Sequence, residues 1–140
     1  MVKFFYNDAS PYLPNRQKLK GFIATIFTKE GKRKLAGLNY IFCTDEYLLQ
    51  VNRDFLQHDY YTDIITFDLS DTPKQVSGEI YISVDRVKDN ALAQQVSFTQ
   101  ELHRVIFHGA LHLCGYKDKK PAEVKAMRSA EDKYLDLYFS

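Results

Sequence analysis

The sequence contains no tryptophan and only two cysteines, Cys43 and Cys114, which lie far apart in the chain. Two isolated cysteines do not build a disulfide framework, so reduced thiols in a cytoplasmic protein are the simpler expectation. No stretch approaches the roughly 20 uninterrupted apolar residues of a membrane-spanning helix. Residues 1–10 also lack the apolar run and cleavage pattern of a signal peptide. We therefore expect a cytoplasmic protein that does not act in a membrane.

An excess of charge of either sign is also missing, because the formal net charge is +1. This balance argues against binding nucleic acid through bulk charge alone, so local basic clusters must carry any such role. One cluster lies at residues 29–34, and we interpret it as solvation of a turn. A second consists of Lys117, Lys119 and Lys120, for which solvation and substrate binding both stay open.

Apolar residues, in contrast, make up 45% of the 140 residues and include ten Phe and ten Tyr. This supply predicts one compact domain over residues 1–140. Strands are predicted at Lys3–Tyr6, Leu38–Cys43, Asp63–Leu69 and Glu79–Ser83, and helices at Arg16–Thr28, Asp45–Phe55, Val84–Gln95, Phe98–Leu113 and Pro121–Phe139. Gly31 is expected to end the first helix and Thr44 to cap the second. The pattern predicts an α+β (mixed α/β) fold with a four-stranded sheet covered by five helices.

The most informative motif lies at the end of the fourth predicted helix. His108 and His112 are four residues apart, so their imidazoles stack one turn above the other on one helical face. Gly115 can reverse the chain in a left-handed conformation and bring Asp118 back toward them. Such a histidine pair alone is more often surface or packing, but the glycine and the carboxylate strengthen the case. Three ligands leave a coordination position open, as in a catalytic zinc site at the C-terminal end of a helix.

Two neighbours of the motif are not expected to bind the metal. His103 lies on a different side of the helix from His108, which predicts a surface or packing role. Cys114 points away from His112, and we interpret it as a small buried hydrophobe.

The segment HGALHLCGY at residues 108–116 resembles the signature of the YbeY family, bacterial metal-dependent endoribonucleases of ribosomal RNA maturation. Upstream, residues 52–53 (NR), 62–67 (TDIITF) and 78–83 (GEIYIS) are similar to further family motifs in the same order. The resemblance implies cleavage of single-stranded RNA in ribosomal RNA processing, including the 3′ end of 16S ribosomal RNA. It also implies ribosomal particles as partners, with a role in ribosome biogenesis and quality control.

The chain departs from the family at the end of this motif. The family usually reads G-Y-D-H, whereas residues 115–118 read GYKD, so Asp118 stands in place of a third histidine. A carboxylate is an acceptable zinc ligand, and we expect one divalent ion, Zn²⁺ before nickel, cobalt, manganese or iron. In an open site this ion would activate water for attack on a phosphodiester.

Further roles are assigned by residue type and by the resemblance. Arg53 is the candidate for gripping the scissile phosphate, with a surface ion pair as its alternative. Asp63 and Glu79 are candidates for orienting a histidine, or else they solvate strand ends. Lys117 and His58 are candidate substrate-binding residues, although a loop histidine usually has no such role. In addition, Tyr60 and Tyr61 could stack on RNA bases or simply pack. The general base is not evident.

Two other functions share part of this residue pattern. A small zinc protease would need the glutamate of a His-Glu-x-x-His motif, but Gly109 occupies that position. A non-catalytic ribosome-assembly factor, stabilised by the metal and binding RNA through Arg53 and the lysines, stays open on sequence alone.

Overall fold

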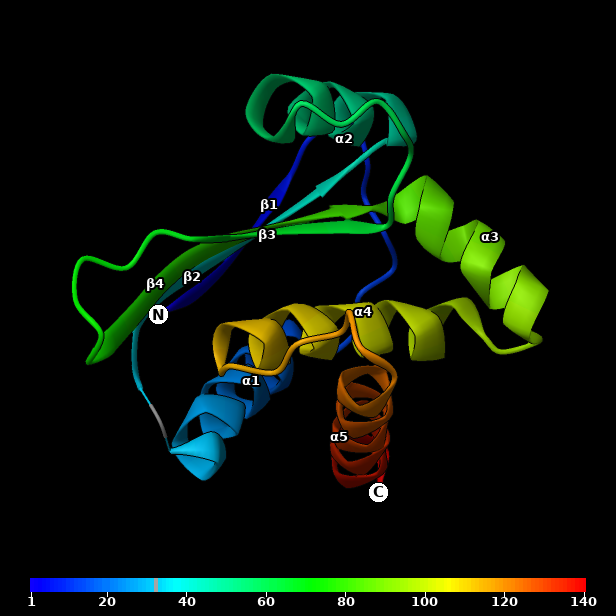
Figure 1. The fold of residues 1–140 in the computed structure, drawn as a ribbon. Coiled ribbons are helices and arrows are strands. Elements are labelled where there is room, and N and C mark those ends of the chain that lie inside the picture. The colour runs from blue at the N-terminus through cyan, green and yellow to red at the C-terminus, as the bar shows by residue number, and fades with distance from the viewer. Residues whose placement is uncertain (32) are drawn as a thin grey trace.

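The computed structural model describes residues 1–31 and 33–140, so Lys32 of the first basic cluster lies outside the described residues. Over this part of the chain the elements are β1 (Val2–Tyr6), α1 (Arg16–Glu30), β2 (Lys34–Cys43), α2 (Asp45–Val51), the π-helical turn η1 (Asn52–Leu56), β3 (Ile64–Asp68), β4 (Gln75–Ser83), α3 (Val84–Gln94), α4 (Phe98–Leu113) and α5 (Pro121–Phe139). The mixed α/β class with a four-stranded sheet and five α-helices is confirmed within the described residues (Figure 1).

The strands form one sheet in the order β1-β2-β4-β3. Strands β1, β2 and β4 run parallel, and β3 pairs antiparallel with β4 at one edge. Strands β2 and β4 are longer than predicted because residues 34–37 of β2 pair with residues 75–77 of β4 around a register shift between Leu35 and Gly37. The shift interrupts the alternation of side chains in this part of β2, so its sequence does not read as a regular strand.

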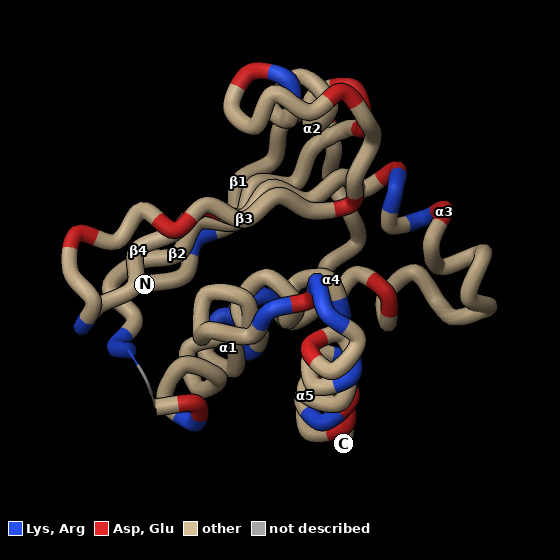
Figure 2. The backbone as a smooth tube through the Cα atoms, in the orientation of Figure 1, with Lys and Arg blue, Asp and Glu red and all other residues tan. Residues whose placement is uncertain are grey.

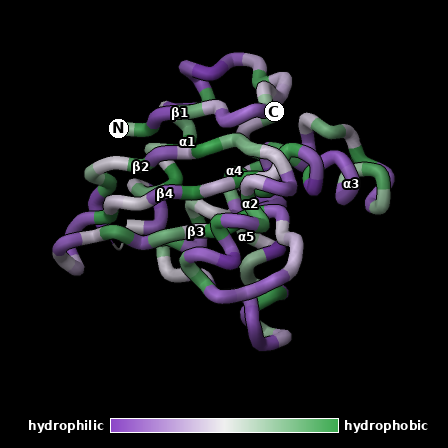
Figure 3. The backbone as a smooth tube through the Cα atoms, turned by 90° about the horizontal axis from the view of Figure 1, so that it is seen from above, coloured by the Kyte–Doolittle hydropathy of each residue, from purple (hydrophilic) through white to green (hydrophobic). Residues whose placement is uncertain are grey.

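Helices cover both faces of the sheet. Helices α1 and α4 lie on one face and α2 lies on the other (Figure 1). Alternation along β3 divides the side chains between the faces, since Ile64 packs into the larger core with α4 and Ile65 packs into the smaller cluster with Leu48 of α2. Figure 3 shows hydrophobic residues concentrated in the sheet and α4, with hydrophilic residues in the peripheral loops.

Three helices begin at capping residues. The side chains of Thr44, Ser83 and Ser97 each accept a hydrogen bond from the backbone N–H three residues further on, at 3.2, 3.1 and 3.0 Å. Thr44 confirms the predicted cap of α2, and Gly31 ends α1 with a φ of 68°, also as predicted. The cap at Ser97 fixes where α4, the helix that carries the candidate site, starts.

Helix α4 is the central helix of the fold and positions the candidate site. It is buried along most of its length, and the hydroxyl of Tyr40 in β2 donates a 2.8 Å hydrogen bond to the carbonyl of Ile106. Helix α5 packs against α4 from the side away from the sheet and carries charges of both signs along its length (Figures 1 and 2). Polar side chains of the two helices meet where they pack, since Arg104 and His108 of α4 both contact Glu131 of α5.

Candidate metal centre

His108 and His112 lie one turn apart at the C-terminal end of α4, as their spacing predicts. Their rings are nearly parallel, with an angle of 6° between the planes and 6.4 Å between the centroids. The His108 side chain is 24% exposed, and His112 is exposed. Both imidazoles therefore face away from the sheet and are within reach of solvent.

The chain reverses directly after α4. Gly115 has a φ of 108°, and the N–H of Tyr116 donates a 3.1 Å hydrogen bond to the carbonyl of Leu111. The reversal brings Asp118 back to the helix, with its Oδ2 atom 3.3 Å from Nε2 of His108. Two ligand atoms of one tetrahedral zinc ion also lie roughly 3.3 Å apart, given metal–ligand bonds of about 2.0–2.2 Å. The separation thus suits two ligands of one ion.

The other ring nitrogen of each histidine has its own hydrogen-bond partner. Nδ1 of His108 lies 2.7 Å from Oε2 of Glu131, and Nδ1 of His112 lies 3.0 Å from the carbonyl oxygen of Tyr116. Because both partners accept hydrogen bonds, each Nδ1 acts as the donor, and in the neutral imidazole Nε2 then carries the lone pair that a metal requires. This is the arrangement that metal-bound histidines commonly have.

The residues present fit a divalent metal by their donor set. Two imidazole Nε2 atoms and the carboxylate of Asp118, which is 40% exposed, are the ligand types of an open zinc site. Within residues 1–31 and 33–140, no three His, Cys, Asp or Glu side chains are already gathered around one metal position. The His108–Asp118 pair is in place, and His112 lies one helical turn away on the same face of α4 with its ring nearly parallel to that of His108.

A pocket of about 340 Å³ lies beside His108 and Asp118, and most of its lining is polar. It includes residues that sequence reasoning missed, namely Arg104, Arg128 and Glu131, together with Asn90, Gln94 and Glu101. Arg104 precedes His108 by one helical turn and could have been found from that spacing. Glu131 lies on α5, and no local signal connects it with α4.

Glu131 is the most connected of these residues. Its side chain is 6% exposed, and its Oε1 atom accepts hydrogen bonds from Arg104 at 3.0 Å and from Arg128 at 3.3 Å. Burial lowers the pKa of His108, but the hydrogen bond and charge of Glu131 outweigh it and raise that pKa above its ordinary value. Burial raises the pKa of Glu131, but the hydrogen bonds from His108 and Arg104 have a larger effect. The pKa of Glu131 is therefore lower than its ordinary value.

Asp63 and Glu79, the two residues predicted to orient a histidine, lie in different places. Asp63 lines the pocket beside His108, and its Oδ2 atom accepts a 3.3 Å hydrogen bond from Asn90. Burial raises the pKa of Asp63. Glu79 alternates with Ile80, which packs toward α4, so Glu79 points to the opposite face of the sheet and accepts a 3.2 Å hydrogen bond from Tyr81. The structure does not bring Glu79 to either histidine.

Arg53 and His58 lie on η1 and the loop after it, on the α2 side of the sheet (Figure 1). Arg53 forms a 2.5 Å ion pair with Asp59, and the ring of His58 stacks on Tyr60 with 5.1 Å between centroids. None of these residues lines the pocket beside His108 within the described chain. The loop leads into Thr62 and Asp63, which do line that pocket, so the chain connects this group to the site but the group is not part of the lining.

The predictions for His103 and Cys114 are confirmed, and the role of Lys117 stays a prediction. His103 is fully buried, donates a 2.7 Å hydrogen bond from Nδ1 to the carbonyl of Thr99 and stacks on Tyr138, which confirms its packing role. Cys114 is buried, as expected of a small hydrophobe. Lys117 is exposed next to Asp118, and Figure 2 shows the connection from α4 to α5 as a short run of basic and acidic residues.

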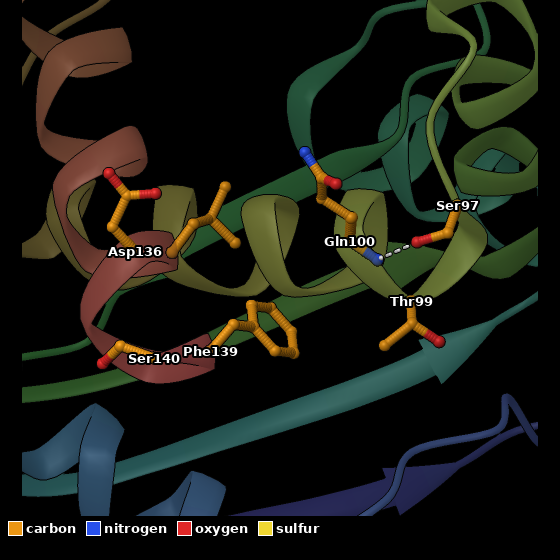
Figure 4. A pocket seen from close by; sticks show the side chains of 7 residues that line it. Ser97, Thr99, Gln100, Asp136, Phe139 and Ser140 are labelled. Carbon is orange, nitrogen blue, oxygen red and sulfur yellow. Dashed lines mark hydrogen bonds between the residues drawn. The ribbon is translucent and has the colours of Figure 1, made fainter.

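A second pocket, of about 380 Å³, lies at the opposite end of α4, near the end of α5 (Figure 4). Its lining includes Asp136, Phe139 and Ser97, and the Ser97 hydroxyl accepts the hydrogen bond that caps α4. Asp136 is the one titratable side chain in this lining. The chemistry-bearing groups between α4 and α5 therefore gather at the His108 end.

In the part of the chain that is described, no helix is long and apolar enough to cross a membrane. A mixed α/β domain with two histidines and a carboxylate at a helix end is typical of metal-dependent hydrolases. A family model described as endoribonuclease YbeY matches residues 8–138. The chain belongs to the endoribonuclease YbeY family.

Individual relatives agree with this assignment. The chain is 54% identical over 136 residues to an endoribonuclease YbeY of Cytophaga hutchinsonii, covering 97% of this chain and 94% of that protein. It is 44% identical over 138 residues to that of Flavobacterium johnsoniae, covering 99% and 97%. A solution structure of a Thermotoga maritima protein superposes with a TM-score of 0.67 at 27% identity, covering 99% of this chain and 89% of that one.

Proposed function

We propose that this chain is a metal-dependent endoribonuclease that hydrolyses phosphodiester bonds of single-stranded RNA during ribosomal RNA processing. The family and the names of its relatives support the endoribonuclease activity. Ribosomal RNA and ribosomal particles are then its partners in the cytoplasm, and residues 1–140 act as one domain. The zinc protease and the non-catalytic assembly factor are not favoured.

One observation carries the site assignment. His108 and His112 each have Nδ1 engaged by an acceptor, which directs Nε2 of each ring toward a metal, and Asp118 returns to within 3.3 Å of Nε2 of His108. We assign these three residues as ligands of one divalent ion, with zinc as the first choice. When bound, such an ion lowers the pKa of a water molecule to roughly 7 and stabilises charge on a phosphoryl oxygen.

The chain's own residues supply the other requirements. Arg128 is 52% exposed at the mouth of the pocket beside His108, so its guanidinium can contact a phosphate there. We assign Arg53 and Lys117 to binding the RNA on either side of the scissile bond, and His58, Tyr60 and Tyr61 to contacts with unpaired bases. Asp63 lines the same pocket with a pKa raised by burial, which suits a group that accepts a proton during attack.

The test is cleavage by protein loaded with a measured amount of zinc. Wild type, Arg53→Ala and His112→Ala are incubated with single-stranded RNA, double-stranded RNA and casein. We expect wild type to cleave single-stranded RNA alone and both variants to lose most of that activity. Tyr12→Phe, a change at a tyrosine that is 72% exposed, serves as the control that keeps full activity. Tight RNA binding without cleavage by wild type would instead leave a non-catalytic RNA-binding protein, and casein cleavage would leave a protease.

A further inference from the structure

Glu131 is a buried acid in a helix that carries none of the proposed ligands. Its side chain is 6% exposed, and a carboxylate at this depth is costly unless each oxygen is paired. Oε1 accepts hydrogen bonds from Arg104 and Arg128, and Oε2 faces Nδ1 of His108 at 2.7 Å. The two oxygens therefore do different things: one is held by arginines and the other is presented to the histidine.

The arginines hold the carboxylate from two directions. Arg104 comes from α4, one turn before His108, while Arg128 comes from α5, one turn before Glu131. Arg104 is 13% exposed and also binds Asp132 at 2.7 Å, so it ties two successive acids of α5 to α4. The position of Oε2 is thus set by contacts between the two helices, independently of any metal.

We propose that Glu131 is a positioning residue of the metal centre, which holds the His108 imidazole in the tautomer and orientation that present Nε2 to the ion. The inference rests on the proposed metal site and adds a residue to it. An acceptor at Nδ1 excludes the tautomer with its proton on Nε2, in which the lone pair would face the wrong way. Outer partners of this kind commonly change metal affinity by roughly 10–100-fold.

A purely structural ion pair is the competing explanation, and the chain contains a matched control for it. Asp132 is the next residue on α5, binds the same Arg104 and does not contact His108. Glu131→Gln and Asp132→Asn each remove one negative charge from the same α4–α5 contact. Only Glu131→Gln changes the group that His108 faces.

The experiment measures zinc affinity by competition with a chromophoric chelator, using the full chain stripped of metal and reloaded. We expect Glu131→Gln to bind zinc roughly 10–100-fold more weakly than wild type. Asp132→Asn should bind zinc as wild type does. Thermal unfolding of the metal-free proteins establishes that both variants are folded. Equal weakening in the two variants, or unchanged affinity in Glu131→Gln, would overturn the proposal.

A second readout needs neither a variant nor RNA. Nitrogen-15 NMR of metal-free wild type, at a pH where His108 is neutral, reports which ring nitrogen carries the proton. We expect the proton on Nδ1, and a proton on Nε2 would overturn the proposal even if Glu131→Gln failed to fold. Loss of RNA cleavage or of metal binding in wild type would count against the proposed function. The tautomer measurement judges Glu131 separately.

Discussion

Gly109 of α4 packs so closely on Ile80 of β4 that a Cβ atom at position 109 would lie 2.8 Å from Cδ1 of Ile80. The same atom would lie 3.0 Å from Cγ2 of Ile80 and 3.1 Å from Cδ1 of Ile64. Position 109 therefore faces the sheet, on a different side of α4 from His108 and His112. The position that carries the catalytic glutamate in His-Glu-x-x-His proteases is therefore packed against the core here, and a side chain at this position would have to displace Ile80.

Adding a methyl group at this contact should destabilise the protein. We expect Gly109→Ala to lower the free energy of unfolding by about 1–3 kcal/mol, because Ile80 is β-branched and its Cγ2 atom cannot move away freely. Gly21→Ala is the control, since nothing lies within 4 Å of a Cβ there and alanine in an exposed helix gains about 0.5–1 kcal/mol over glycine. Chemical denaturation measures both, and equal stability of the two variants would contradict the close contact.

His103 should make stability depend on pH. Burial lowers its pKa, only partly offset by the hydrogen bond to Thr99, so the unfolded chain binds the proton more tightly. The contribution of the neutral His103 to the free energy of unfolding is fully present above about pH 6.5, the pKa of histidine in the unfolded chain. This contribution is lost as the pH falls below that value. His103→Phe keeps an aromatic ring beside Tyr138 and Phe139 and should flatten this dependence.

The measurement is thermal unfolding of metal-free protein between about pH 8 and pH 5. Wild type should lose stability steadily on the acid side, and His103→Phe should lose less. An identical pH dependence in the two proteins would mean that His103 is not held neutral in the folded state. His58→Phe, on an exposed loop, controls for the loss of one histidine.

Glu30 connects the end of α1 to the loop that carries the site. It accepts a 3.0 Å hydrogen bond from the hydroxyl of Tyr116 and a 2.5 Å hydrogen bond from that of Tyr134. We expect Tyr116→Phe and Tyr134→Phe each to cost about 0.5–1.5 kcal/mol of stability. The backbone carbonyl of Tyr116 accepts from His112 and stays in Tyr116→Phe, but the substitution releases the loop that holds this carbonyl from Glu30. We therefore expect Tyr116→Phe, and not Tyr134→Phe, to weaken zinc binding. Equal zinc affinity in the two variants would mean that the hydrogen bond between Glu30 and Tyr116 does not support the metal centre.

Asp118 and Lys117 are adjacent and should have separable roles. Asp118→Ala removes a proposed ligand, so freshly purified protein should contain much less metal than wild type. Lys117→Ala removes an exposed charge beside the site, and it should keep full metal content while binding single-stranded RNA more weakly. Elemental analysis and RNA titration at two salt concentrations measure these effects. Full metal content in Asp118→Ala would refute the third ligand.

The sequence alone was sufficient for features that depend on neighbours within one turn. The cap at Thr44, the helix end at Gly31 and the stacking of His108 on the same face as His112 follow from backbone geometry over a few residues. The return of Asp118 after Gly115 belongs to the same class, because a left-handed residue at a helix end sets the direction of the next few residues.

Tertiary structure alone decided which distant side chains meet. Glu131 reaches His108 because α5 packs on α4, and Glu79 is turned away because the register of β4 directs it to the α2 face. Arg53 pairs with Asp59 outside the pocket, while Arg104 and Arg128 line it. Local periodicity assigns a face to each residue, but the packing of helices and sheet determines what lies opposite that face.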